Sequence, residues 1–149
     1  MKKALYNIIM NDNTVIEDNI ITSRADKAAE MKKSGKYNCA QAVACAFADC
    51  IDADEETIKN MTQAFGVGMG TLEATCGALI GAGVVLGMAN KDRVKTVQDV
   101  RAVMNSFIER NGTVTCKELK GVGTGKVVRE CVDCVRDAAE FLEAALKNS

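Results

Sequence analysis

Apolar residues recur every three or four positions along most of the chain, which is the spacing of one face of an α-helix. Residues that favour helix N-termini stand before three of these stripes: Ser23, which can form a capping box with Asp26, then Asn38, and then Asp54. The pattern predicts five amphipathic helices, over residues 23–35, 38–50, 54–65, 94–111 and 128–146.

Residues 76–87 differ from these stripes because they are apolar on every side and rich in glycine. A helix of this kind is buried all round, so we expect it at the centre of a bundle. The strand signal is weak after residue 20. The prediction is therefore an all-α single domain of five or six helices, spanning residues 21–149.

The first twenty residues follow another pattern. Apolar stretches at residues 5–10 and 14–16 are separated by Asn11-Asp12-Asn13. Short apolar stretches on either side of a polar turn are typical of a β-hairpin. Residues 1–20 are expected to form such a hairpin or an arm.

Composition and charge exclude several classes of function. The 149 residues carry 19 Lys and Arg against 20 Asp and Glu, so no strong field favours nucleic acid or an anionic membrane. There is no His, which excludes a Ser-His-Asp or Cys-His pair and any His-ligated zinc or haem within this chain. Residues 74–90, the longest uncharged apolar run, are too short and glycine-rich for a membrane span.

The chain has seven cysteines, although it has no His. The N-terminus does not have the pattern of a signal peptide, and an odd number of cysteines argues against an extracellular disulfide scaffold. The expected compartment is a reducing cytoplasm, where clustered cysteines bind metal or take part in redox chemistry.

Three of the cysteines share a local setting. Cys39, Cys76 and Cys116 each follow Asn or Thr, which are good N-cap residues. If these caps form, each thiol lies in the first turn of a helix, where free backbone N–H groups and the helix dipole stabilise a thiolate. Thiolate is the nucleophilic and the metal-binding form of cysteine.

The remaining cysteines divide into two groups. Cys131 and Cys134 are three residues apart and so face the same side of a helix, which is a redox or metal signal. Cys45 and Cys50 lie in an Ala-rich stretch without a cap, and we expect them to pack as small apolar side chains. Packing alone is the alternative for the other five as well.

The glycines suggest close packing. Gly66, Gly68 and Gly70 do not match a dinucleotide-binding fingerprint, and the segment Gly121–Lys126 lacks the Ser or Thr of a phosphate loop. Gly77 would let another segment approach and leave room beside Cys76. The glycines expected to contact a cofactor are Gly68, Gly70 and Gly77.

The order of these motifs resembles one known family. The segments are Asn38-Cys39-Ala40-Gln41-Ala42-Val43, Phe65-Gly66-Val67-Gly68-Met69-Gly70, Cys76-Gly77-Ala78-Leu79-Ile80-Gly81, Cys116-Lys117-Glu118-Leu119, and Cys131 with Val135. They are similar to those of small proteins that are described as redox-active and named for a C…CGAxxG…C…C motif. The resemblance implies a helical redox protein with Cys39, Cys76, Cys116 and Cys131 as its site. A more distant similarity to split-Soret cytochromes does not carry haem over, because the chain lacks His and Cys-x-x-Cys-His.

Two chemistries remain open for these four cysteines. They could hold an iron–sulfur cluster for electron transfer, or they could cycle between thiols and disulfides. The alternatives are an all-cysteine zinc-binding structural module and a non-catalytic helical interaction protein. The expected partner is a redox protein or a small-molecule substrate, and a homodimer is consistent with the pattern.

Overall fold

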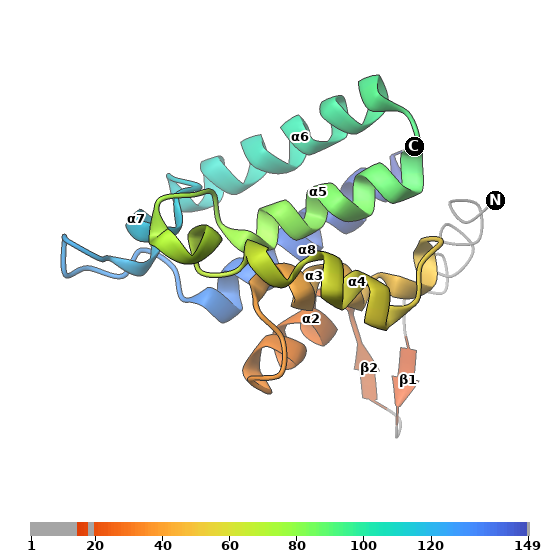
Figure 1. Ribbon diagram of the computed structural model, residues 1–149, viewed down its shortest axis with the longest axis horizontal. Coiled ribbons are helices and arrows are strands. Elements are labelled where there is room, and N and C mark those ends of the chain that lie inside the picture. The colour runs from red at the N-terminus through yellow and green to blue at the C-terminus, as the bar shows by residue number, and fades with distance from the viewer. Residues whose placement is uncertain (1–14, 18–19, 149) are drawn as a thin grey trace.

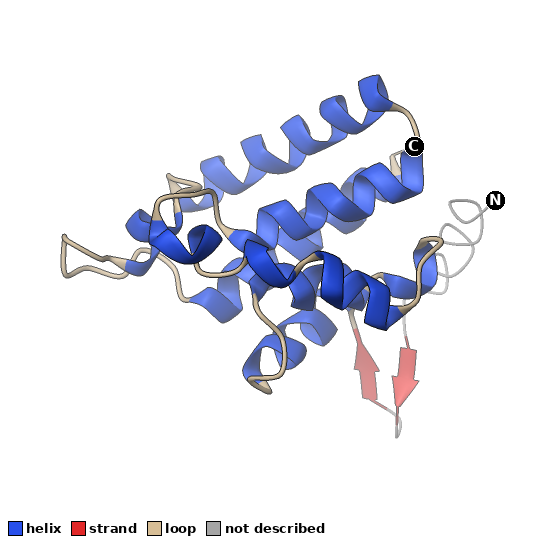
Figure 2. Ribbon diagram, in the orientation of Figure 1, coloured by secondary structure: helices blue, strands red, loops and turns tan. Residues whose placement is uncertain are grey.

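The computed structural model describes residues 15–17 and 20–148, and most of them are helical (Figures 1 and 2). The predicted all-α class is confirmed. The helices of the described part are α2 (Arg24–Lys33), α3 (Cys39–Ala46), α4 (Glu55–Met61), α5 (Gly77–Asn90), α6 (Arg93–Asn111), α7 (Cys116–Lys120) and α8 (Cys131–Lys147).

The glycine-rich helix α5 lies among the other helices, as its apolar sequence predicts, but it is not buried on every side, because Ile80, Val84 and Met88 are half-buried. It packs against α3, α6 and α8, and α2 packs against α8 (Figure 1). The approach of α3 is close because Gly81 has no side chain: a Cβ there would lie 2.5 Å from the carbonyl oxygen of Ala40. Leu79, Val85 and Leu86 of α5 are fully or nearly fully buried in the core.

Two helices are shorter than the apolar pattern predicts. α3 ends at Ala46 instead of Cys50, and the chain continues in a 3₁₀ turn. The reason is Arg24, which is buried, donates to the carbonyl oxygen of Ala46 and pairs with both carboxylate oxygens of Asp49. A side chain from another helix thus satisfies the carbonyl that a longer α3 would use.

A contact from a distant side chain also shortens α4, which ends at Met61 instead of near Phe65. The side-chain amide of Asn38 donates to the carbonyl oxygens of Thr62 and Gln63. These carbonyls are therefore used between elements instead of along a helix.

The N-terminal hairpin differs from the expected one. Strand β1 (Val15–Glu17) pairs antiparallel with strand β2 (Ile20–Thr22), with Val15 opposite Thr22. The hairpin therefore extends past residue 20, where the helical domain was expected to begin. The expected strand at residues 5–10 lies outside the described residues.

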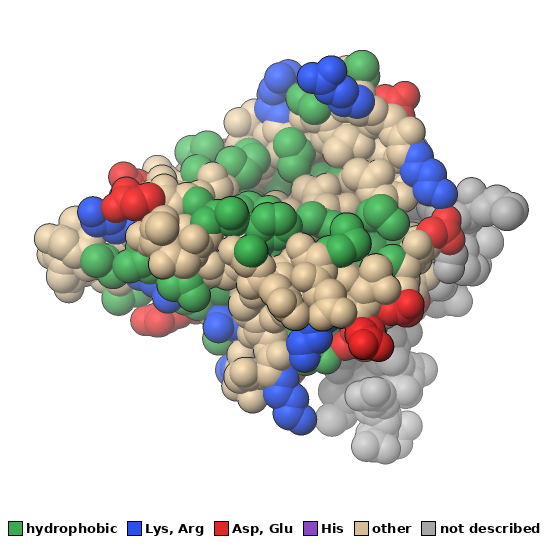
Figure 3. Space-filling view, viewed as in Figure 1, with side chains coloured by type: hydrophobic (Ala, Val, Ile, Leu, Met, Phe, Trp, Pro, Cys, Tyr) green, Lys and Arg blue, Asp and Glu red, His purple; other side chains and the backbone are tan. Residues whose placement is uncertain are grey.

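One face of the molecule is apolar along α5. Figure 3 shows apolar side chains gathered across this face, with charged side chains toward the edges. On α6, Val94, Val97 and Ile108 are exposed. Across residues 15–17 and 20–148, no helix is both long enough and apolar enough to span a bilayer.

Candidate functional site

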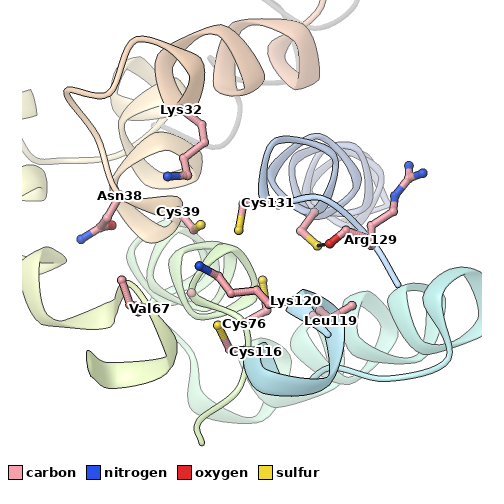
Figure 4. A pocket seen from close by; sticks show the side chains of 12 residues that line it. Lys32, Asn38, Cys39, Val67, Cys76, Cys116, Leu119, Lys120, Arg129 and Cys131 are labelled. Carbon is pink, nitrogen blue, oxygen red and sulfur yellow. Dashed lines mark hydrogen bonds between the residues drawn. The ribbon is translucent and has the colours of Figure 1, made fainter. Parts of the chain in front are cut away.

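Five of the seven cysteines line one pocket at the helix ends near the start of α5 (Figure 4). The pocket encloses about 50 Å³ and is also lined by Lys32, Lys120 and the backbone of Gly77. That volume accommodates a few water molecules. The cysteines that meet there are Cys39, Cys76, Cys116, Cys131 and Cys134.

Four of these cysteines stand at helix starts, but not all in the way the sequence predicts. Asn38 caps α3 in a complete capping box with Gln41, which places Cys39 at the first helical position. Thr75 does not cap α5, because Cys76 itself occupies the N-cap position.

The other two helix starts lack a side-chain cap. Thr115 is the N-cap residue of α7, but its side chain caps nothing, and Glu118 instead accepts a hydrogen bond from Thr113. Cys131 begins α8 directly after Glu130, which makes no capping hydrogen bond either. The apolar pattern predicts that this helix begins at Val128, but it begins three residues later; Glu130 is not a preferred N-cap residue, so no cap pattern marks the start.

A short antiparallel bridge holds Cys76 beside Cys116. It pairs Thr75 with Thr115. The amide of Cys76 donates to the carbonyl oxygen of Val114 at 2.7 Å, and the amide of Cys116 donates to that of Ala74 at 3.0 Å. The bridge brings together two helix starts that are forty residues apart in the sequence.

The glycine-rich turn before α5 packs against Cys116 and lines part of the pocket. Val67, Gly68, Met69 and Gly70 all have positive φ, between 52° and 77°. That conformation is costly for a β-branched residue such as Val67, which lines the pocket. A Cβ on Gly68 would lie 2.9 Å from the Cβ of Cys116, so glycine is needed here for close packing.

The three glycines expected to contact a cofactor have different positions. Gly77 lines the pocket, and a Cβ there would lie 2.3 Å from the carbonyl oxygen of Phe65. Gly68 packs on Cys116, as described above. A Cβ on Gly70 would meet no atom within 4 Å. Gly68 and Gly77 thus allow the segments around the cysteines to approach one another.

Cys39 and Cys131 form an outer pair. They are the two cysteines that are partly exposed, whereas the other five are buried. The neighbouring Cys39 and the charges of Lys120 and Lys32 together lower the pKa of Cys131 to about 6, against the effect of burial. The neighbouring Cys131, together with burial, raises the pKa of Cys39. Figure 4 shows the two side chains facing each other, with Lys120 extending toward them.

Cys76 and Cys134 form an inner pair. The neighbouring Cys134 lowers the pKa of Cys76 against the effect of burial, and the backbone N–H groups of Ala78 and Leu79 at the start of α5 act in the same direction. The neighbouring Cys76, together with burial, raises the pKa of Cys134. The Cys134 thiol donates to the carbonyl oxygen of Arg129 at 3.8 Å. The local geometry therefore favours the thiolate on Cys76, the residue at the helix N-terminus.

Cys116 lies in the same pocket without a comparable shift toward thiolate. Burial raises its pKa, although Lys120 opposes that effect. It is 7% exposed. Cys116 is held beside Cys76 by the backbone bridge, but its setting is closer to that of a packed thiol.

The order and position of these cysteines agree with one protein family. A sequence profile of the family described as "Putative redox-active protein (C_GCAxxG_C_C)" matches residues 37–145. The chain belongs to this redox-active family. Comparisons with curated proteins and with solved structures gave no match.

The glycines of the motif in this redox-active protein have a packing role. The motif segment, residues 76–81, begins at the N-cap of α5. Its two glycines, Gly77 and Gly81, lie against the carbonyl oxygens of Phe65 and Ala40, respectively. The motif thereby seats α5 close to its neighbours and fixes Cys76 in the pocket.

The structure also shows site residues that sequence reasoning did not emphasise. Cys134 is outside the four-cysteine site that the resemblance implies, yet it lies beside Cys76 in the pocket, and its three-residue spacing from Cys131 was the available signal. Lys32 and Lys120 line the pocket because the fold brings their helices to it, and no sequence pattern indicates this position. In the described part of the chain, no three Cys, Asp or Glu side chains are arranged so that they could hold one metal ion.

Proposed function

We propose that this protein is a dithiol–disulfide oxidoreductase in which Cys131 attacks a substrate disulfide and Cys39 resolves the mixed disulfide. The observation that supports it is the outer pair: two partly exposed thiols that line one pocket and face each other (Figure 4). One thiol is stabilised as a thiolate, and its partner keeps a proton. A nucleophilic thiolate beside a resolving thiol is the arrangement that disulfide exchange needs.

The reaction balances without a further reactant. The Cys131 thiolate attacks one sulfur of the substrate disulfide, a mixed disulfide forms, and the other substrate sulfur leaves as a thiolate that takes up a proton. Cys39 then loses its proton and attacks the sulfur of Cys131. A Cys39–Cys131 disulfide forms, and the second substrate thiol is released. Two electrons pass from the protein dithiol to the substrate.

Lys120 and Lys32 assist by charge. Both are close enough to lower the pKa of Cys131. A thiolate is most effective in exchange when its pKa lies near the ambient pH, so a pKa of about 6 leaves Cys131 mostly ionised at neutral pH. We place this activity in a reducing compartment, where the dithiol form would be regenerated.

The test is oxidation of the fully reduced protein with glutathione disulfide, followed by acid quenching and peptide mapping without reductant. The wild-type protein should form a Cys39–Cys131 disulfide. Cys131→Ser should slow the reaction on the order of 100-fold or more, because the ionised nucleophile is gone. Cys39→Ser should stop at a glutathione adduct on Cys131.

Cys45→Ala is the matched control, since Cys45 is buried on the same helix as Cys39 but does not line the pocket. It should react within about twofold of wild type. An adduct that forms on Cys39 in preference to Cys131, or a Cys131→Ser variant that reacts at the wild-type rate, would contradict the assignment. Iron with sulfide, or stoichiometric zinc, in anaerobically purified protein would instead support a cluster or a zinc module.

A further inference from the structure

We propose that Cys76 and Cys134 form a second dithiol, which exchanges a disulfide with the Cys39–Cys131 pair inside the pocket and allows the protein to give up a second pair of electrons. This inference rests on the proposed dithiol function of the outer pair. It assigns a role to the inner pair.

The inner pair is not placed to meet a substrate. Cys76 is 5% exposed and Cys134 is 2% exposed, whereas Cys39 and Cys131 are partly exposed. A bulky disulfide would reach the outer pair first. The inner thiols would then be oxidised through a neighbouring disulfide within the protein.

The two pairs share one pocket and one helix. All four cysteines line the same pocket. Cys131 and Cys134 lie one turn apart on α8, which packs against both α3 and α5, the helices that begin at Cys39 and just after Cys76. Each pair consists of one cysteine on α8 and one cysteine at the start of another helix.

The charges in the pocket select the direction of attack. In a Cys39–Cys131 disulfide, the sulfur of Cys131 is the better leaving group, because Lys120 stabilises its thiolate, whereas Lys32 acts on both sulfurs. Cys76 should therefore attack the sulfur of Cys39. The ionisation of Cys39 and that of Cys76 influence each other electrostatically, as expected for neighbouring sulfurs.

The exchange then proceeds in two balanced steps. The Cys76 thiolate attacks Cys39, a Cys39–Cys76 bond forms, the Cys39–Cys131 bond breaks, and Cys131 leaves as a thiolate. Cys134 next gives up its proton and attacks Cys76, and a Cys76–Cys134 disulfide forms. Cys39 leaves and takes the proton released by Cys134. The outer pair is again a thiol beside a thiolate, ready for a second substrate disulfide.

The experiment is a stepwise titration of the reduced protein with glutathione disulfide in the absence of oxygen. Samples are quenched with acid over time, alkylated and mapped as disulfide-linked peptides. Wild type should lose four thiols per chain, with the Cys39–Cys131 link appearing before the Cys76–Cys134 link. Cys50→Ala is the control, because Cys50 is buried outside the pocket, and it should give the same four-thiol result.

Substitutions at two positions test the route. Cys134→Ser removes the resolving thiol, so the Cys39–Cys76 link should accumulate, and Cys134→Ala should behave alike if the serine variant is poorly folded. Cys131→Ser should slow oxidation of the inner pair at least tenfold, because the outer disulfide that feeds it cannot form. Circular dichroism of each variant checks that the helical fold is retained.

The outcomes separate this proposal from the one before it. If the Cys39–Cys131 disulfide forms but only two thiols are lost, the proposal of a second dithiol is wrong and the proposed function of the outer pair stands. Inner-pair oxidation at the wild-type rate in Cys131→Ser would also overturn the route. If no Cys39–Cys131 disulfide forms in wild type, the outer-pair function itself is wrong.

Discussion

The two ends of α3 carry the same residue type in opposite settings. Cys39, at the first position of the helix, lies in the pocket opposite Cys131. Cys45, six residues later, is 3% exposed, and burial raises its pKa to about 11. Cys50, just beyond the helix, is also buried, and burial raises its pKa to about 12.

The difference shows that position in the fold, and not the cysteine content of the chain, decides which thiols are poised to react. A helix start, a partner thiol and nearby lysines together favour a thiolate. Cys45 and Cys50 are buried in the hydrophobic core, as the sequence predicts, although the Arg24–Asp49 ion pair lies at the same end of α3. α5 shows the same contrast in its glycines, since Gly77 is tightly packed beside the pocket and Gly87 is not.

The largest expected effect in this comparison is on stability. Gly77→Ala would place a Cβ 2.3 Å from the carbonyl oxygen of Phe65, and that backbone atom cannot move away cheaply. We expect a loss of about 3 kcal/mol in the free energy of unfolding. Urea denaturation followed by circular dichroism measures it. A loss below about 1 kcal/mol would show that the start of α5 is not tightly seated.

The next effect is the difference in thiol reactivity between Cys131 and Cys45. With pKa values of about 6 and about 11, and allowing for the lower intrinsic nucleophilicity of the more acidic thiol, Cys131 should react about 30-fold faster with iodoacetamide at neutral pH. The burial of Cys45 should widen the gap. Peptide-resolved labelling against time gives both rates.

The same labelling gives the sign of the pH dependence. The rate at Cys131 should fall as the pH drops through about 6, because its thiolate becomes protonated, and should level off above that pH. The rate at Cys45 should still be rising well above neutral pH. If the labelling rates of Cys131 and Cys45 depend on pH in the same way, the two thiols do not differ in pKa as proposed.

A smaller effect is expected at the far end of α5. A Cβ on Gly87 would meet no atom within 4 Å, and the residue lies inside the helix. Gly87→Ala should therefore stabilise the protein by about 0.5–1 kcal/mol, because alanine loses less backbone freedom on folding. The same urea titration measures it, with Gly77→Ala as the opposing case. Destabilisation by Gly87→Ala would mean that this end of α5 is also closely packed.

The smallest effect concerns Lys120, whose charge lowers the pKa of Cys131. Lys120→Met should raise that pKa and slow labelling of Cys131 at about pH 5.5 by roughly two- to threefold, as partial loss of one nearby charge predicts. Lys120→Arg should restore the wild-type profile, since it keeps the charge. A profile that is unchanged in Lys120→Met would show that the Lys120 charge does not lower the pKa of Cys131.

Much of the fold could be predicted because helix starts are local. Ser23, Asn38 and Asp54 cap α2, α3 and α4 as their sequence positions predict. Helix ends were less predictable because distant side chains decide them: Arg24 holds the last carbonyl of α3, and Asn38 holds carbonyls beyond α4. Local sequence carries no signal for such contacts.

The site was predictable in membership more than in arrangement. The family resemblance named four of the five cysteines that line the pocket, but of the three expected caps only that of Asn38 forms, and the role of these cysteines stays a prediction. How they pair depends on α8 meeting α3 and α5, and on the bridge between Thr75 and Thr115. These are long-range contacts, and a cap-and-cysteine pattern cannot show them.

The distance along the chain between the outer cysteines has a thermodynamic consequence. Cys39 begins the second of the described helices and Cys131 begins the last one, roughly ninety residues later. A disulfide between them would tie most of the unfolded chain into one loop and reduce its entropy. The oxidised protein would then be more stable than the reduced protein by about 4–5 kcal/mol. Its melting temperature would therefore report its redox state, and unfolding would make the disulfide easier to reduce.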